Sequence, residues 1–209
     1  MVLENRILDL GLVEYIKALQ LQTEFFGEVK TGSWKSALVF CRHYPVITFG
    51  RQAKKENLKV DELELFRRGI PVYPVERGGD VTYHGPGQLV IYPVLHLELF
   101  KKDLHFFLRK LEETVIAVLS EFGIRALARK GLTGVWVDKH KISSIGITVK
   151  NWISYHGLAL NVKDDDLANF SLIRPCGMDI EMTSMETVLK ENISFEDVKK
   201  IFIRRFGYV

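Results

Sequence analysis

The spacing of hydrophobic residues along the 209-residue chain predicts helices alternating with short strands in its first third. Apolar residues recur at helical intervals over residues 12–28, which predicts an amphipathic helix there. Residues 36–50 have the composition of two strands joined by a turn at Tyr44-Pro45. A short helix is expected over residues 61–68.

The second half of the chain carries the strongest periodic patterns. Residues 103–122 predict a long helix with Asp103 as its N-cap. A terminal helix is expected to begin after Ser194. Consecutive strands are expected at residues 134–138, 141–150 and 153–162. Strands gathered in the middle with helices around them indicate an α+β fold of mixed sheets flanked by helices. With no linker-like composition, we expect one domain, residues 1–209.

The stretch "RGGDVTYHGPGQLVIYP", residues 77–93, combines four glycines with Arg77 and His84 and then becomes apolar. Strand-like segments lie on either side of it, so it is expected to be a flexible loop. Its glycines would let a ligand approach the backbone closely. The stretch lacks the patterns GxxxxGK[ST] and GxGxxG, so it does not indicate a phosphate site. The alternative is an ordinary hairpin loop with a bulge.

Cys176 and Lys141 are the candidates for covalent chemistry. Cys176 lies in a Pro-Cys-Gly turn close to Arg174, which is the setting of a reactive thiolate. Cys41, inside an apolar run, is instead expected to be buried. Lys141 begins an apolar strand, where a lysine is usually a solvated strand end. If it points into a site, its ammonium would favour a neighbouring thiolate.

Composition and charge narrow the class of protein. His43, His84 and His156 lack the spacing of metal ligands, so no metal site is expected. The net charge of +3 suits an acidic protein partner and does not indicate nucleic acid. We see no signal peptide and no run long enough to span a membrane, and only two cysteines. A cytoplasmic protein with reduced thiols is therefore expected.

Five segments occur in an order that resembles the lipoyl(octanoyl) transferases: "RGGDVTYHGPGQLVIYP", "GVWV", "KISSIGI", "HGLALNV" and "RPCGM". That family shares its fold with the biotin and lipoate protein ligases, so the resemblance implies their catalytic domain. Two positions depart from the family pattern. Asp80 stands where many members have Gln, and Ser143 lies in a segment that often has Ala.

The resemblance also implies residue roles. Cys176 resembles the nucleophile that forms an acyl-thioester, and Lys141 resembles the partner that lowers its pKa and moves protons. Backbone N–H groups around Gly78-Gly79 are candidates to hold an oxyanion. The implied substrate pocket is lined by Arg77, Gly78, Gly79, Asp80, Val81, Thr82, Tyr83, His84, Ser144, Ile145, Gly146, Gly157, Leu158 and Ala159.

The implied reaction is the first step of endogenous protein lipoylation and needs no cofactor. An octanoyl group would pass from octanoyl-acyl carrier protein, through Cys176, to a lysine of a lipoyl domain. The implied acceptors are E2 subunits of 2-oxoacid dehydrogenases and the H protein of glycine cleavage. One alternative is an ATP-dependent lipoate-protein ligase on the same fold, which needs no cysteine nucleophile. Another is a non-catalytic module that holds acylated carrier proteins.

Overall fold

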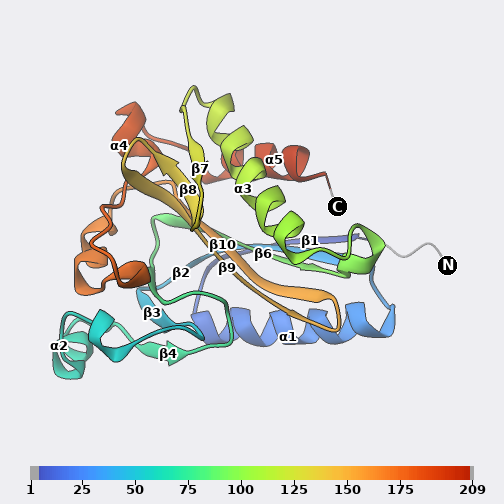
Figure 1. Cartoon of the computed structure of the whole chain (residues 1–209), viewed down its shortest axis with the longest axis horizontal. Coiled ribbons are helices and arrows are strands. Elements are labelled where there is room, and N and C mark those ends of the chain that lie inside the picture. Colours follow the sequence, from blue (N-terminus) through green and yellow to red (C-terminus); the bar gives the residue numbers. More distant parts are fainter. Residues whose placement is uncertain (1–4, 208–209) are drawn as a thin grey trace.

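A seven-stranded mixed sheet forms the centre of the fold, in the order β1-β2-β6-β10-β9-β8-β7 (Figure 1). The structure is a computed structural model that describes residues 5–207, and at Cys176 it describes the backbone alone. β1 pairs in parallel with β2, and the other neighbours are antiparallel. The strands are β1 (Asn5–Val13), β2 (Ser36–His43), β6 (Gln88–Leu95), β7 (Leu127–Arg129), β8 (Leu132–Val137), β9 (His140–Lys150) and β10 (Ile153–Asn161).

A three-stranded sheet in the order β4-β3-β5 lies beside the larger one. Its strands are β3 (Val46–Phe49), β4 (Val72–Pro74) and β5 (Val81–His84). β3 runs parallel to β4 and antiparallel to β5, so this sheet is also mixed. The predicted α+β fold with mixed sheets flanked by helices is confirmed.

The Gly-rich stretch is not the flexible loop that its composition predicts. Four of its residues form β5, and every residue of that strand is buried. Valine, threonine and tyrosine favour the pleated, packed environment of a strand, and here they pair with β3. The glycines before and after β5 therefore form bends at the two ends of a strand.

Helices cover both faces of the large sheet (Figure 1). Side chains alternate along a strand, so Val39 and Cys41 of β2 pack under α1 (Tyr15–Thr31), whereas Leu38 and Phe40 face α3 (Leu104–Glu121) and α5 (Phe195–Phe206). The short helices are α2 (Glu62–Arg67) and α4 (Met185–Leu189). A 3-10 turn, η4 (Pro175–Gly177), precedes α4 and carries Cys176.

The predicted starts of α3 and α5 are confirmed by their caps, whereas the helix predicted from residue 12 begins at Tyr15, because residues 12 and 13 belong to β1. The Asp103 side chain accepts a hydrogen bond from the Phe106 backbone N–H at 2.9 Å, and Ser194 caps α5 in the same way. α3 buries Phe107, Leu111 and Val115 in the core beside the large sheet. Within residues 5–207, no helix combines the length and the apolar character needed to cross a bilayer.

Candidate active site

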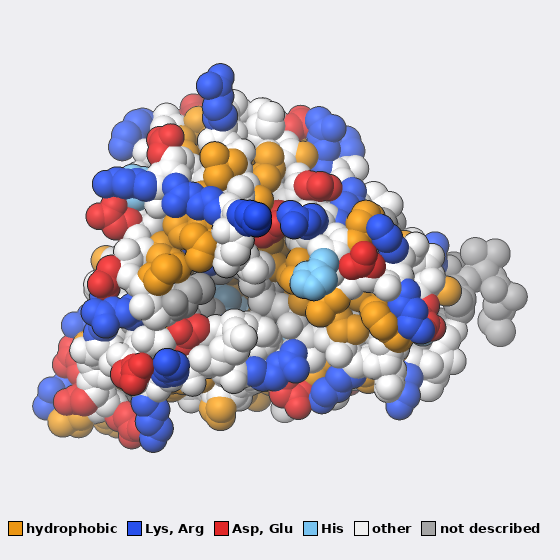
Figure 2. Space-filling view, in the orientation of Figure 1, with side chains coloured by type: hydrophobic (Ala, Val, Ile, Leu, Met, Phe, Trp, Pro, Cys, Tyr) orange, Lys and Arg blue, Asp and Glu red, His pale blue; other side chains and the backbone are white. Residues whose placement is uncertain are grey.

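A cavity of about 660 Å³ lies where the Gly-rich stretch meets β9, β10 and η4. Figure 2 shows this face of the molecule hollowed near its centre. Lys141 lines the cavity together with all the predicted pocket residues except Tyr83. These lining residues are Arg77, Gly78, Gly79, Asp80, Val81, Thr82, His84, Ser144, Ile145, Gly146, Gly157, Leu158 and Ala159.

Tyr83 corrects the predicted pocket. Val81, at the start of β5, borders the cavity, and beyond it the side chains alternate, so Thr82 and His84 line the cavity while Tyr83 points to the other face. There Tyr83 is fully buried, and its hydroxyl donates to Asp166 Oδ2 at 3.3 Å and accepts from Asn169 Nδ2 at 2.9 Å. Tyr83 therefore anchors β5 to the segment that contains Asp166 and Asn169, and its side chain does not line the cavity.

Arg77 supports the cavity wall from inside the protein. It is 8% exposed, and its Nε and Nη2 each donate to Thr48 Oγ1 at 3.0 Å. Nη2 also donates to the Thr48 carbonyl at 2.7 Å, and Nη1 donates to the Gly78 carbonyl at 3.1 Å. The resemblance placed Arg77 in the substrate pocket, but these bonds hold its guanidinium group against β3. They attach the start of the Gly-rich stretch to the small sheet.

The backbone of Gly78 is also engaged. Its N–H donates to the Ile147 carbonyl of β9 at 3.0 Å. This amide is therefore not available to an oxyanion, and the prediction is wrong for Gly78. A Cβ at Gly146 would lie 2.7 Å from the Gly78 carbonyl oxygen, closer than side-chain carbons approach oxygen in proteins. The two backbones therefore form one continuous wall, and Gly79 stays an untested candidate for the oxyanion.

Lys141 is not a solvated strand end. It is 4% exposed, and its Nζ lies 5.5 Å from the centroid of the Trp136 ring, within the range of a cation–π interaction. Its backbone N–H donates to the Glu181 carbonyl, and its carbonyl accepts from Thr183, both at 2.9 Å. These two hydrogen bonds to residues 181–183 fix the Lys141 backbone, and its side chain extends to the cavity.

Gly134, in the segment "GVWV", makes room for Lys141, a role that the sequence pattern did not indicate. Its φ of +130° is a conformation that side chains disfavour, and a Cβ there would lie 2.5 Å from Lys141 Cε and 3.2 Å from Nζ. The Gly134 N–H donates to the buried carboxylate of Glu112 on α3 at 3.0 Å. Glu112 and Gly134 together shape the space that the lysine occupies.

The turn that carries Cys176 borders the same cavity. Pro175 and Met178, on either side of Cys176, both line it. The side chain of Cys176 itself lies outside the described part of the structure. Cys41 is different, because it is 1% exposed and burial raises the pKa of its thiol far above the usual range. The predicted burial of Cys41 is confirmed.

Neutral rings line the inner part of the cavity. Burial lowers the pKa of His84 to about 3 and that of His156 to about 4, so both imidazoles are uncharged near neutral pH. Tyr15 and Tyr92, which the sequence did not suggest, lie beside them. His43 contacts the Tyr92 hydroxyl at 2.7 Å. In the described part of the chain, no three His, Cys, Asp or Glu side chains gather as a metal site would require.

Comparison with known proteins places this chain in a family. Residues 14–207 match the family model described as the lipoyl protein ligase A/B catalytic domain. An octanoyltransferase of Thermoanaerobacter sp. (strain X514) is 42% identical over 208 residues, which are 99% of this chain and 90% of that protein.

Two solved structures share the fold at low sequence identity. Lipoate-protein ligase A bound with ATP superposes with a TM-score of 0.76 at 18% identity, covering 98% of this chain and 85% of that one. Biotin protein ligase from Aquifex aeolicus gives 0.55 at 12% identity, covering 99% and 68%. These two likenesses support the fold alone, whereas the family match and the identity to the octanoyltransferase extend along almost the whole chain. The chain therefore belongs to the lipoyl protein ligase A/B catalytic domain family.

Proposed function

We propose that this protein transfers an octanoyl group from octanoyl-acyl carrier protein to a lysine of a lipoyl domain, through a thioester on Cys176. The observation that carries the proposal is that the Cys176 turn and the buried Lys141 border one cavity. Part of the wall of that cavity is backbone, apolar side chains and uncharged rings, and this part suits a saturated acyl chain. The relative that is 42% identical is named an octanoyltransferase, which supports octanoyl as the group that is transferred.

The first half-reaction acylates the enzyme. The Cys176 thiol passes its proton to the Lys141 amine, which gives a thiolate paired with an ammonium, and the thiolate attacks the carbonyl carbon of the donor thioester. A new carbon–sulfur bond forms on Cys176 and the bond to the carrier's sulfur breaks. The Lys141 ammonium returns its proton to the departing carrier thiolate. One thioester replaces another, so the step needs no external source of energy.

The second half-reaction transfers the acyl group. The ε-amine of the acceptor lysine attacks the acyl-Cys176 carbonyl and loses a proton to Lys141. The carbon–sulfur bond breaks, an amide forms, and the proton passes to the released Cys176 sulfur. An amide is more stable than a thioester, so this step drives the overall transfer. In this scheme Lys141 takes up one proton and releases it again in each half-reaction.

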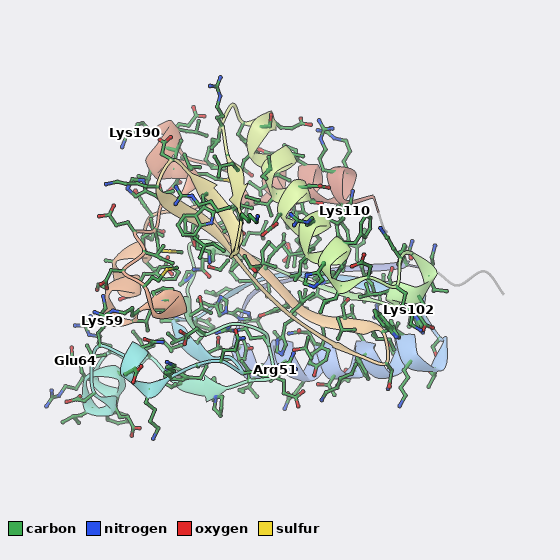
Figure 3. All side chains as sticks on the ribbon, in the orientation of Figure 1. Arg51, Lys59, Glu64, Lys102, Lys110 and Lys190 are labelled. Carbon is green, nitrogen blue, oxygen red and sulfur yellow. The ribbon has the colours of Figure 1, made fainter. Side chains whose placement is uncertain are left out.

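The proposed partners are acidic acyl carrier protein as donor and, as acceptors, lipoyl domains of E2 subunits and the glycine cleavage H protein, all in the cytoplasm. Two basic segments, "RQAKK" at residues 51–55 and "RKG" at residues 129–131, are candidates to dock the carrier, and both reach the cavity, since Arg51 and Gly131 line it. Figure 3, in the same orientation as Figure 2, labels Arg51 below the position of the hollow and Lys110 above it. Positive charge on both sides would attract an acidic carrier to the opening.

We expect octanoyl transfer to proceed without ATP or Mg²⁺, because the donor thioester already holds the energy of the bond. The test is to mix purified protein, octanoyl-acyl carrier protein and a lipoyl domain without nucleotide and to measure the mass of the lipoyl domain. Free octanoate with ATP serves as the comparison. A strict requirement for ATP with free octanoate as the only donor would support the ligase alternative, and tight binding of the donor without transfer would support the binding module.

We expect recognition of the carrier to be sensitive to salt. The KM for octanoyl-acyl carrier protein should rise several-fold as the Debye length falls from about 10 Å at 0.1 M to about 3 Å at 1 M salt. Reversing exposed charges near the opening, with Lys54→Glu and Lys130→Glu together, should raise the KM at low salt and weaken its salt dependence. Lys190→Glu, at the end of α4, is the matched control. A KM that does not change with salt would mean that these lysines are only solvated surface groups.

A further inference from the structure

Asn57 contacts the segment that carries Cys176, although it is not one of the two proposed catalytic residues, Cys176 and Lys141. It ends a 3-10 turn (Lys55–Asn57) and is 5% exposed. Its backbone carbonyl accepts a hydrogen bond from the Arg174 N–H at 2.7 Å. Its side-chain amide faces Gly177, since a Cβ built on that glycine would lie 3.8 Å from Asn57 Nδ2. Asn57 is thus hydrogen-bonded to the segment just before Cys176 and faces the residue just after it.

Asp80 fixes Asn57 in turn. Its Oδ2 accepts from Asn57 Nδ2 at 2.6 Å, and its Oδ1 accepts from the N–H groups of Val81 at 2.7 Å and Lys54 at 3.4 Å. Both carboxylate oxygens are therefore engaged by the protein. Hydrogen bonds to an ionised carboxylate are roughly twice as strong as neutral ones, so Asp80 firmly connects the Gly-rich stretch to the segment that holds the turn.

The Cys176 turn depends on this support because it is short. Within η4, the Gly177 N–H donates to the Arg174 carbonyl at 3.1 Å and the Met178 N–H donates to the Pro175 carbonyl at 3.2 Å. Next to Asn57, the Lys59 N–H donates to the Leu172 carbonyl at 2.8 Å. The hydrogen bonds inside a 3-10 turn have poor geometry. The position of η4 therefore depends on residues 57–59, which are hydrogen-bonded to the chain just before it.

We propose that Asp80 and Asn57 are positioning residues that hold the Cys176 turn at the cavity, and that Asp80 acts there through its carboxylate rather than by contact with the acyl chain. This inference rests on the proposed function of Cys176. A misplacement of about 1 Å can lower a rate on the order of 100-fold.

Exchanging the two side chains tests the pair. Asn57→Asp alone places two carboxylates at the 2.6 Å contact, where they repel. With Asp80→Asn added, the amide now at position 80 can donate to the carboxylate now at position 57, while its oxygen accepts from Val81 and Lys54. Acylation of Cys176 by octanoyl-acyl carrier protein, followed by intact mass in a single turnover, should slow 10- to 100-fold in Asn57→Asp and return to within about threefold in the double variant. The KM for the carrier should stay unchanged in both.

The control is Glu56→Gln in the same turn, where the side chain is exposed and pairs with Lys54 at 3.7 Å. It should acylate at the wild-type rate. All rates are measured below the melting temperature of each variant. If Asn57→Asp does not fold, Asp80→Ala, which leaves the Asn57 amide without its acceptor, takes its place with the same expected slowing.

Two results would overturn the inference. One is a folded Asn57→Asp, or its replacement Asp80→Ala, that acylates at the wild-type rate. The other is a folded double variant that acylates as slowly as the single variant. Failure of the proposed function looks different, because wild-type protein would then transfer octanoyl groups without any adduct on Cys176. Wild-type acylation together with unaffected variants would reject the positioning role alone.

Discussion

Cys176→Ser is expected to abolish octanoyl transfer and to leave no acyl adduct on the protein. Wild-type protein mixed with octanoyl-acyl carrier protein should gain the mass of one octanoyl group, which hydroxylamine removes. A hydroxyl is a far weaker nucleophile than a thiolate when no base is arranged for it, so the loss should be at least on the order of 10³-fold. Intact-protein mass and the mass of the lipoyl domain measure the two steps separately.

Cys41 provides the matched control for this experiment. It is 1% exposed and lies inside β2, and burial raises the pKa of its thiol so that it stays protonated. Cys41→Ala should therefore retain the adduct and the transfer activity, with at most a loss of stability from the small cavity it leaves. An adduct on Cys41, or transfer that persists in Cys176→Ser, would contradict the covalent mechanism.

The parts of the fold that the sequence predicts well are those with long periodic patterns. α3 and the strands β8, β9 and β10 repeat their apolar positions over enough residues to reveal their type. β1 was not predicted, although Leu8, Leu10 and Leu12 alternate with Asp9 and Gly11. It is an edge strand whose residues are exposed or half-buried, and the helical pattern read from residue 12 overlaps its end. β7 and α4, with three and five residues, are too short to show a period.

The candidate site, like the fold, has parts that the sequence predicts and parts that it does not. The residues predicted from the motifs form about half of the cavity lining, because each motif is a continuous segment that the fold brings to the cavity. Contacts between distant segments were not predictable: Arg77 with Thr48, Gly78 with Ile147, and Glu112 with Gly134. Such contacts depend on which segments the fold brings together. The direction of Tyr83 was missed for a simpler reason, because alternation applies only once β5 is known to be a strand.

Substitution of Lys141 should separate the two roles that the mechanism gives it. Lys141→Met keeps most of the buried volume beside Gly134 and Trp136 but removes the charge. The apparent pKa of Cys176, read from the pH dependence of alkylation by iodoacetamide, should rise toward the value of about 8.5 of an unassisted thiol. Transfer to the acceptor lysine should fall by roughly 10² or more, the usual contribution of a positioned acid–base group.

Lys141→Arg then distinguishes charge from proton transfer. Arginine keeps the positive charge but does not release a proton in the working range of pH. It should therefore preserve much of the thiolate, and some acylation of Cys176, while transfer to the amine is lost. Because the space at Gly134 is narrow, melting temperatures must show that both variants fold as the wild type does. Transfer at the wild-type rate in Lys141→Arg would mean that another group carries the proton. An unchanged thiol pKa in a folded Lys141→Met would mean that the buried ammonium does not stabilise the thiolate.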